Sequence, residues 1–133
     1  MDTLEQAQKI FSGDVFATGT VGIRLTDAHA GYAKCVLEVN EKHLNANGVV
    51  MGGAIFTLAD FAFAVASNFE ELNTASLSSQ ITYLSAAKCS VLTAEAKRVK
   101  EGRSTCYYVI DITDEGGKAI AQVTTTGFIV RHN

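Results

Sequence analysis

The sequence predicts an α+β fold in which a curved antiparallel β-sheet wraps around one long helix. The stretch 52–68 is almost entirely apolar, and the chain on both sides of it is rich in short β-type runs. A single apolar helix beside several long strands buries its surface only if the sheet curls around it. At 133 residues and 47% hydrophobic residues, we expect one domain over residues 1–133.

Two kinds of element precede the long helix. A short helix is expected at about residues 3–12, with Thr3 as its N-cap. Two strands follow, the second in GYAKCVLEV (31–39), where apolar and polar side chains alternate as in a sheet with one buried face. The turn-rich stretch EKHLNANG then leads into the helix expected at about 52–68.

The chain after the long helix reads as four strands, expected at 75–85, 90–99, 104–113 and 119–130. The connections KEGR and DEGGK between the last three are short and contain glycine. Because such connections are typical of hairpins, these three strands should be antiparallel neighbours. A curved sheet also leaves strand edges that can pair with a second copy, so we expect at least a dimer.

Charge and composition exclude several classes of function. The net charge is -3 with both signs interspersed, which lacks the basic footprint of a nucleic-acid binder. The polar N-terminus MDTLEQAQKIF shows no export signal, so we expect a cytoplasmic protein. The three cysteines are widely spaced, which fits neither disulfides nor zinc ligands, and we expect them to be reduced and buried.

The apolar stretch is too short to favour a membrane span. Residues 52–66 would cover roughly 22 Å as a helix, less than the ~30 Å hydrocarbon core. Asp60 would also lie near the centre of the span, where a charge is costly. A buried helix of a soluble protein is the better interpretation.

Asp60 is the single ionisable side chain of this helix. At 100° per residue it falls on one narrow stripe, and the residues of that stripe are Gly53, Thr57, Asp60, Ala64, Ser67 and Asn68. The stripe could be the solvent face of an amphipathic helix, although such faces usually carry several charges. Alternatively, a carboxylate in a confined apolar cleft marks a functional site.

Gly52 and Gly53 lie at the expected start of the helix. Backbone N–H groups there have no partner within the helix, and the helix dipole favours negative charge. Without side chains, the pair would let an oxyanion approach closely, as in the attack on a thioester carbonyl. A tight turn or close helix packing would also explain two glycines at this position.

The stretch HLNANGVVMGGAIFTLAD (43–60) resembles the signature of the hotdog-fold thioesterases of the phenylacetate-degradation type, H-x-N-x-x-G-x-x-H-G-G followed by six residues and Asp. SLSSQITYLSAAK (76–88) is similar to the next strand of that family. The resemblance implies a hotdog fold, hydrolysis of acyl-CoA thioesters, and homodimers that often pair into homotetramers with sites at the subunit boundary. It implies no metal and no cofactor apart from the CoA of the substrate.

The resemblance also implies residue roles. Asp60 matches the catalytic carboxylate, as general base or as nucleophile, and Gly52 matches the oxyanion-hole donor. Asn45 matches a residue beside the water and thioester, and Ser76 a hydroxyl that places the water. Without the resemblance, Asn45 would be read as a turn residue of NANG.

Substrate contacts are implied for a second group: Gly53, Met51, Tyr83, Lys88, Lys100 and Arg103. The two hairpin cations would meet the CoA phosphates, although a solvated hairpin explains them equally well. Phe56, Phe61 or Phe63, with the partner subunit, would line the acyl pocket. His29 and His132 are expected in a loop and in the C-terminal tail.

Met51 departs from the pattern, because the family has a histidine there. Methionine replaces a hydrogen-bond donor by an apolar surface, so activity should be weaker or shifted in substrate.

Two alternatives stay open: an acyl-CoA binding module without catalysis, and a hotdog 3-hydroxyacyl thioester dehydratase. The dehydratase would need a histidine and a carboxylate as an acid/base pair across the pocket.

Overall fold

The structure is a computed structural model that describes residues 2–131. The helices and strands occur in the predicted order: α1 (Thr3–Phe11), η1 (Phe16–Val21), β1 (Arg24–His29), β2 (Tyr32–Glu38), η2 (Glu41–His43), α2 (Gly52–Asn68), β3 (Thr74–Tyr83), β4 (Val91–Glu101), β5 (Thr105–Asp114) and β6 (Ala119–Ile129). His29, expected in a loop, is the last residue of β1, where its ring stacks on Tyr32. His132 lies outside the described residues.

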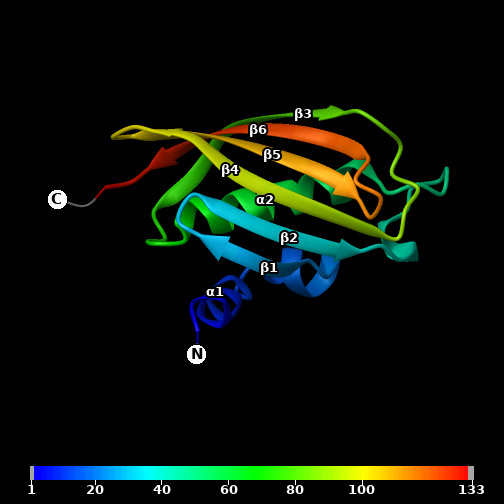
Figure 1. The fold of residues 1–133 in the computed structure, drawn as a ribbon, viewed down its shortest axis with the longest axis horizontal. Coiled ribbons are helices and arrows are strands. Elements are labelled where there is room, and N and C mark those ends of the chain that lie inside the picture. Colours follow the sequence, from blue (N-terminus) through cyan, green and yellow to red (C-terminus); the bar gives the residue numbers. More distant parts are fainter. Residues whose placement is uncertain (1, 132–133) are drawn as a thin grey trace.

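The six strands form one antiparallel sheet in the order β1-β2-β4-β5-β6-β3. The predicted hairpins β4–β5 and β5–β6 are confirmed. Strand β3 follows α2 but pairs with β6, so it forms one edge of the sheet while β1 forms the other. Figure 1 shows the sheet curving around α2, which confirms the predicted α+β arrangement.

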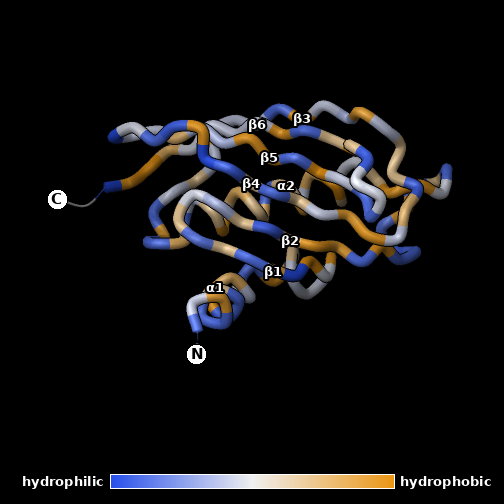
Figure 2. Tube along the Cα trace, in the orientation of Figure 1, coloured by the Kyte–Doolittle hydropathy of each residue, from blue (hydrophilic) through white to orange (hydrophobic). Residues whose placement is uncertain are grey.

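The concave face of the sheet and α2 form the core. Helix α2 contacts all six strands, and its buried residues include Leu58, Phe61 and Phe63. Hydrophobic and hydrophilic residues alternate along β2 and β4 (Figure 2), so each strand turns its apolar side chains toward the helix. The packed helix is therefore held on most of its circumference.

Both ends of α2 are tied down by polar contacts. At its start, the N–H of Met51 donates to the carbonyl of His43 at 2.8 Å. At its end, the Asn68 amide accepts from the N–H of Thr74 at 2.8 Å and donates to the Thr74 carbonyl at 3.1 Å. These contacts fix the helix along its axis, which sets the positions of the groups it carries.

The N-terminal segment differs from the prediction in two details. Asp2, and not Thr3, caps α1, because its carboxylate reaches the N–H of Glu5 at 2.8 Å. The short π-helix η1 was not predicted, since its sequence FATGTV combines glycine with residues of modest helix propensity. It contacts α2 on the side that the sheet leaves open.

The cysteines are free, as expected. Cys35 and Cys106 are buried, whereas Cys89 is only partly buried, which corrects the expectation for that residue. Among residues 2–131, no helix has both the length and the apolar character that crossing a membrane requires.

Gly127 on β6 tests the packing between the sheet and α2. A Cβ at this position would lie 2.7 Å from Cys106 Sγ and 2.9 Å from the Phe63 ring. We expect Gly127→Ala to lower the free energy of unfolding by about 1–3 kcal/mol, because the core must shift to admit the methyl group. Urea denaturation measures this.

The matched control is Gly116→Ala, whose nearest neighbour would be Asp114 Oδ1 at 3.5 Å, an ordinary contact. It should change the free energy of unfolding by no more than about 0.5 kcal/mol. Equal effects of the two substitutions would contradict the close packing at Gly127.

Candidate functional site

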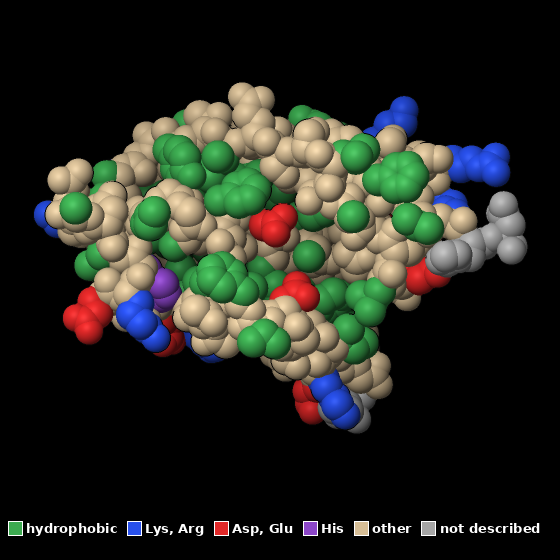
Figure 3. All heavy atoms as spheres, turned by 180° about the vertical axis from the view of Figure 1, so that it is seen from behind, with side chains coloured by type: hydrophobic (Ala, Val, Ile, Leu, Met, Phe, Trp, Pro, Cys, Tyr) green, Lys and Arg blue, Asp and Glu red, His purple; other side chains and the backbone are tan. Residues whose placement is uncertain are grey.

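The predicted stripe of α2 is the face that the sheet does not cover. Gly53 and Asp60 are exposed in the chain, while the side chains that point the other way are buried. Three recesses follow this face, of about 590, 310 and 540 Å³. On this side of the molecule, opposite to the view of Figure 1, hydrophobic side chains surround a few acidic ones (Figure 3). The helix therefore presents its carboxylate in a largely apolar surface.

Asp60 lies in the smallest of these hollows, which we call the Asp60 recess. Its lining residues are Asp14, Val15, Phe16, Ala17, Thr57, Asp60 and Phe61. No residue in the range 2–131 is seen to donate a hydrogen bond to the Asp60 carboxylate. Partial desolvation by the walls of the recess raises the pKa of Asp60 above its usual value although the residue is still accessible to solvent, and the negative charge of Asp14 raises the pKa further.

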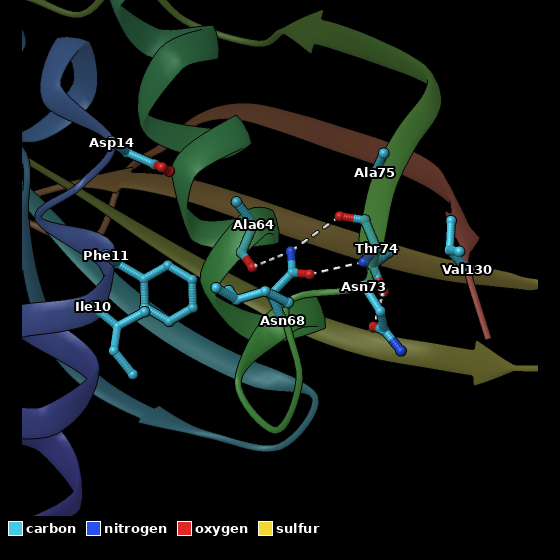
Figure 4. A pocket seen from close by; sticks show the side chains of 10 residues that line it. Ile10, Phe11, Asp14, Ala64, Asn68, Asn73, Thr74, Ala75 and Val130 are labelled. Atoms are coloured by element: carbon cyan, nitrogen blue, oxygen red, sulfur yellow. Dashed lines mark hydrogen bonds between the residues drawn. The ribbon is translucent and has the colours of Figure 1, made fainter. Parts of the chain in front are cut away.

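Asp14 is the residue of this recess that sequence reasoning missed. It lies between α1 and η1, 46 positions before Asp60 and outside the motif, so no signal in the sequence connects the two. Its side chain points toward α2 (Figure 4), and it lines both the Asp60 recess and the adjoining hollow beside Ala64 and Asn68. The site thus contains two carboxylates of like charge.

The start of α2 offers unoccupied backbone donors. Within residues 2–131, the N–H groups of Gly52 and Gly53 have no recorded acceptor, and Met51 supplies no side-chain cap. The hydroxyl of Tyr83 donates to the Gly52 carbonyl at 2.9 Å. Because the peptide unit is planar and trans, holding this carbonyl also sets the direction of the Gly53 N–H.

Gly52 has no room for a side chain. A Cβ there would lie 2.7 Å from the Tyr83 hydroxyl oxygen, whereas a Cβ on Gly53 would meet nothing within 4 Å. The predicted glycine pair thus divides into one position required for close packing and one that opens onto the surface. Close packing against Tyr83 therefore accounts for the glycine at position 52, and anion binding by the pair stays a prediction.

Met51 and His43 lie on the other side of this helix start. Met51 is 57% exposed and lines the recess of about 590 Å³ together with Gly53. His43 is buried: its Nδ1 accepts from the N–H of Asn40 at 3.0 Å, and its Nε2 lies 2.7 Å from the Val21 carbonyl. A proton on Nε2 satisfies both contacts, so this ring ties η1 to η2.

Asn45 and Ser76 do not meet Asp60 within one chain. The Asn45 side-chain oxygen accepts from the N–H groups of Asn47 and Val49, at 2.9 and 3.3 Å, so it stabilises its own turn. Ser76 lies exposed on the edge strand β3, beside a bulge of that strand. Neither residue lines the Asp60 recess.

The expected coenzyme contacts fall at two ends of the sheet. Tyr83 lines a recess of about 420 Å³ beside Gly52, and the chain continues from there to Lys88. Lys100 and Arg103 belong to the β4–β5 hairpin. This hairpin lies near the C-terminal end of α2, because the Arg98 N–H donates to the Gly31 carbonyl and the Gly31 N–H donates to the Ala66 carbonyl of the helix. One chain therefore does not bring these two pairs of residues together.

The family model described as "Thioesterase superfamily" matches residues 47–121, more than half of the chain and the whole of α2. This chain belongs to the thioesterase superfamily. The match contains Gly52 and Asp60, but it does not reach α1, η1 or β1.

Individual relatives agree with the family. The chain is 39% identical to a putative esterase of Archaeoglobus fulgidus over 83% of this chain and 72% of that protein. It is 30% identical to the acyl-coenzyme A thioesterase PaaI of Escherichia coli over 88% and 84% of the two chains. These similarities confirm the resemblance to the phenylacetate-degradation type and the prediction of an enzyme of the thioesterase class.

A solved structure supports the fold. A hypothetical thioesterase of Streptococcus pneumoniae TIGR4, determined with coenzyme A, superposes with a TM-score of 0.79 and 28% identity, covering 95% of this chain and 98% of the other. The predicted hotdog fold, an antiparallel sheet around a long helix, is therefore confirmed in this member of the superfamily.

The electrostatic effect of Asp14 can be measured directly. In the folded protein, the pKa of Asp60 should lie above the ordinary carboxyl value, and Asp14→Asn should lower it, because the substitution removes a like charge. Carboxyl ¹³C shifts followed against pH by NMR report both values.

The control is Asp27→Asn, which removes the same charge from the exposed β1 strand, away from the recess. It should leave the titration of Asp60 unchanged. An Asp60 titration that does not respond to Asp14→Asn, or that responds equally to both substitutions, would contradict the coupling.

Proposed function

We propose that this protein is an acyl-CoA thioesterase that hydrolyses aryl or medium-chain acyl-CoA to the free acid and CoA. The observation that carries the proposal is a pairing on one helix: N–H groups at its start that have no acceptor, and a carboxylate that has no hydrogen-bond donor, among residues 2–131. Relatives named as acyl-CoA thioesterases and a relative determined with coenzyme A support the substrate class.

The chemistry follows from these two groups. Asp60 takes a proton from a water molecule, whose oxygen attacks the thioester carbonyl, or its own oxygen attacks and forms a mixed anhydride that water then hydrolyses. The negative charge that develops on the carbonyl oxygen meets the Gly52 N–H at the positive end of the helix. The C–S bond breaks, and the CoA thiolate leaves and takes up a proton.

A raised pKa of Asp60 suits the role of a base. A carboxylate with an ordinary pKa is a weak base at neutral pH, and partial desolvation in the recess, together with the nearby charge of Asp14, raises the pKa of this one and makes it a stronger base. Asn45 would orient the water or the carbonyl with its free amide group, and Ser76 would help place the water. Neither role requires a metal or a further cofactor.

A complete site requires a second chain. Gly52 and Asp60 are eight residues apart on one helix, roughly 12 Å along its axis, so they cannot both touch one carbonyl group. We infer a homodimer, with pairing of dimers into a homotetramer, in which Asp60 of one chain faces Gly52 of the other. The exposed edge strand β3, with Leu77 62% exposed, supports such pairing.

A dimer would also account for the separated cations. Lys100 and Arg103 of the partner would approach the Tyr83 and Lys88 end of the first chain if the two α2 helices run antiparallel.

Of the described histidines, neither lines the Asp60 recess, which disfavours the dehydratase, because that reaction needs a histidine beside the carboxylate. We propose that the protein acts in the cytoplasm.

Substitution of the carboxylate is the main test. Asp60→Asn should lower kcat on the order of 10² to 10⁴-fold, since the amide neither accepts the proton nor attacks. A panel of aryl, short, medium and long acyl-CoA compounds in a thiol-release assay gives the rates. Asp27→Asn is the matched control and should keep full activity.

Three outcomes separate the hypotheses. Hydrolysis by the wild type that survives Asp60→Asn undiminished would refute the mechanism. Binding of the esters by the wild type without any turnover would favour the binding module. Activity that depends on Asp60 supports the thioesterase.

Tyr83→Phe tests the donor at the helix start. The phenyl ring fills the same space but no longer holds the Gly52 carbonyl, which frees the peptide unit that follows the Gly52 donor and loosens the helix start, so kcat should fall while KM changes little. A rise in KM at constant kcat would instead assign Tyr83 to substrate binding alone. Tyr107→Phe, an exposed tyrosine of β5, serves as the control.

A further inference from the structure

The buried ring of Phe61 is a wall shared by two hollows. On one side it lines the Asp60 recess, and on the other it lines a cavity of about 460 Å³ whose walls come from α1, the α1–η1 region and β1. We call the second hollow the α1–β1 cavity. Phe61 directly follows Asp60, is only 2% exposed, and is the lining residue that the two hollows share.

The α1–β1 cavity is suited to an apolar occupant. Its inner wall consists of Phe11, Ile23, Leu25 and Phe61, all buried. Its polar lining is partly engaged already, since the Gln8 amide donates to the Leu25 carbonyl at 2.8 Å.

The cavity has one charged lining residue, Arg24. Its guanidinium lies 3.0 Å from the Glu38 carboxylate, and both side chains are largely exposed. That charge is therefore paired at the surface and does not call for an anion inside the cavity.

We propose that the α1–β1 cavity is the subsite for a linear, saturated acyl chain, and that Phe61 sets the longest chain accepted. The proposal rests on the proposed function, because it takes Asp60 as the point where the thioester lies. A short acyl group fits in the Asp60 recess, whereas a longer chain must pass Phe61 to reach the cavity.

The walls of this subsite, apart from Phe61, lie outside the region matched by the family model. The match to the family model begins at residue 47, so α1, η1 and β1 lie outside it, while Phe61 and Asp60 lie inside. Of the three phenylalanines considered from sequence, Phe61 lines both hollows, whereas Phe63 packs edge-to-face on Tyr108 with ring centroids 5.3 Å apart.

The test measures kcat/KM for hexanoyl-, octanoyl-, decanoyl-, dodecanoyl- and palmitoyl-CoA. Phe61→Leu should move the preferred chain by at least two methylene groups to longer esters. Because each methylene that enters an apolar site contributes about fourfold, the ratio of dodecanoyl-CoA to hexanoyl-CoA should rise by roughly tenfold or more.

Two further variants make the result specific. Phe63→Leu changes the same residue type on the same helix, at the same 2% exposure, without touching either hollow, and should leave the chain-length profile unchanged. Ser12→Leu fills the α1–β1 cavity from its exposed rim and should shift the preference to shorter chains. General loosening of the fold cannot produce shifts in opposite directions.

The outcomes separate this proposal from the proposed function. Equal profiles of Phe61→Leu and Phe63→Leu, or no shortening with Ser12→Leu, would overturn the subsite even in an active thioesterase. If the wild type hydrolyses none of the esters, the proposed function fails. Calorimetric Kd values for the same panel then decide on the subsite. The chain length that binds most tightly should increase in Phe61→Leu, decrease in Ser12→Leu and stay unchanged in Phe63→Leu.

Discussion

The apolar circumference of α2 constrains the rest of the molecule. A helix with one ionisable side chain can be kept from water only by a sheet that curves around it, and the six strands provide that surface. Coverage stops at the stripe that carries Gly53, Thr57 and Asp60. The apolar circumference of α2 therefore accounts for both the fold and the site. The polar groups of the helix lie where the sheet stops covering it, and the hollows lie along the same uncovered stripe.

The acidic groups along the uncovered face of α2 destabilise the folded protein. A carboxyl group whose pKa is raised in the folded state binds its proton more tightly there than in the unfolded chain. Its contribution to stability is therefore present at low pH and is lost as the pH rises through the folded pKa. At neutral pH, Asp60 and Asp14 repel each other in a confined space, which is the arrangement by which active sites obtain reactive carboxylates.

Much of the fold could be predicted because its signals are local. The apolar run predicted α2, and alternation with glycine turns predicted the hairpins β4–β5 and β5–β6. The π-helix η1 has no such signal, since it is held by contacts with α2 and by the bond from His43 to Val21. Asp14 was missed because only folding brings it close to Asp60. The separation of Lys100 from Lys88 could not be predicted either, because it depends on the order of the strands in the sheet.

The three recesses along the uncovered face of α2 and the α1–β1 cavity each have a wall formed by the N-terminal segment, residues 8–21, whereas the carboxylate and the helix start lie in the region matched by the family model. The groups proposed to react and most of the walls of these hollows thus belong to separate stretches of the chain, with Phe61, next to Asp60, as the exception. Exchanging the first twenty or so residues for those of a relative would change the walls of these hollows and leave the carboxylate and the helix start as they are. A change in these walls then needs no alteration of the groups proposed to react.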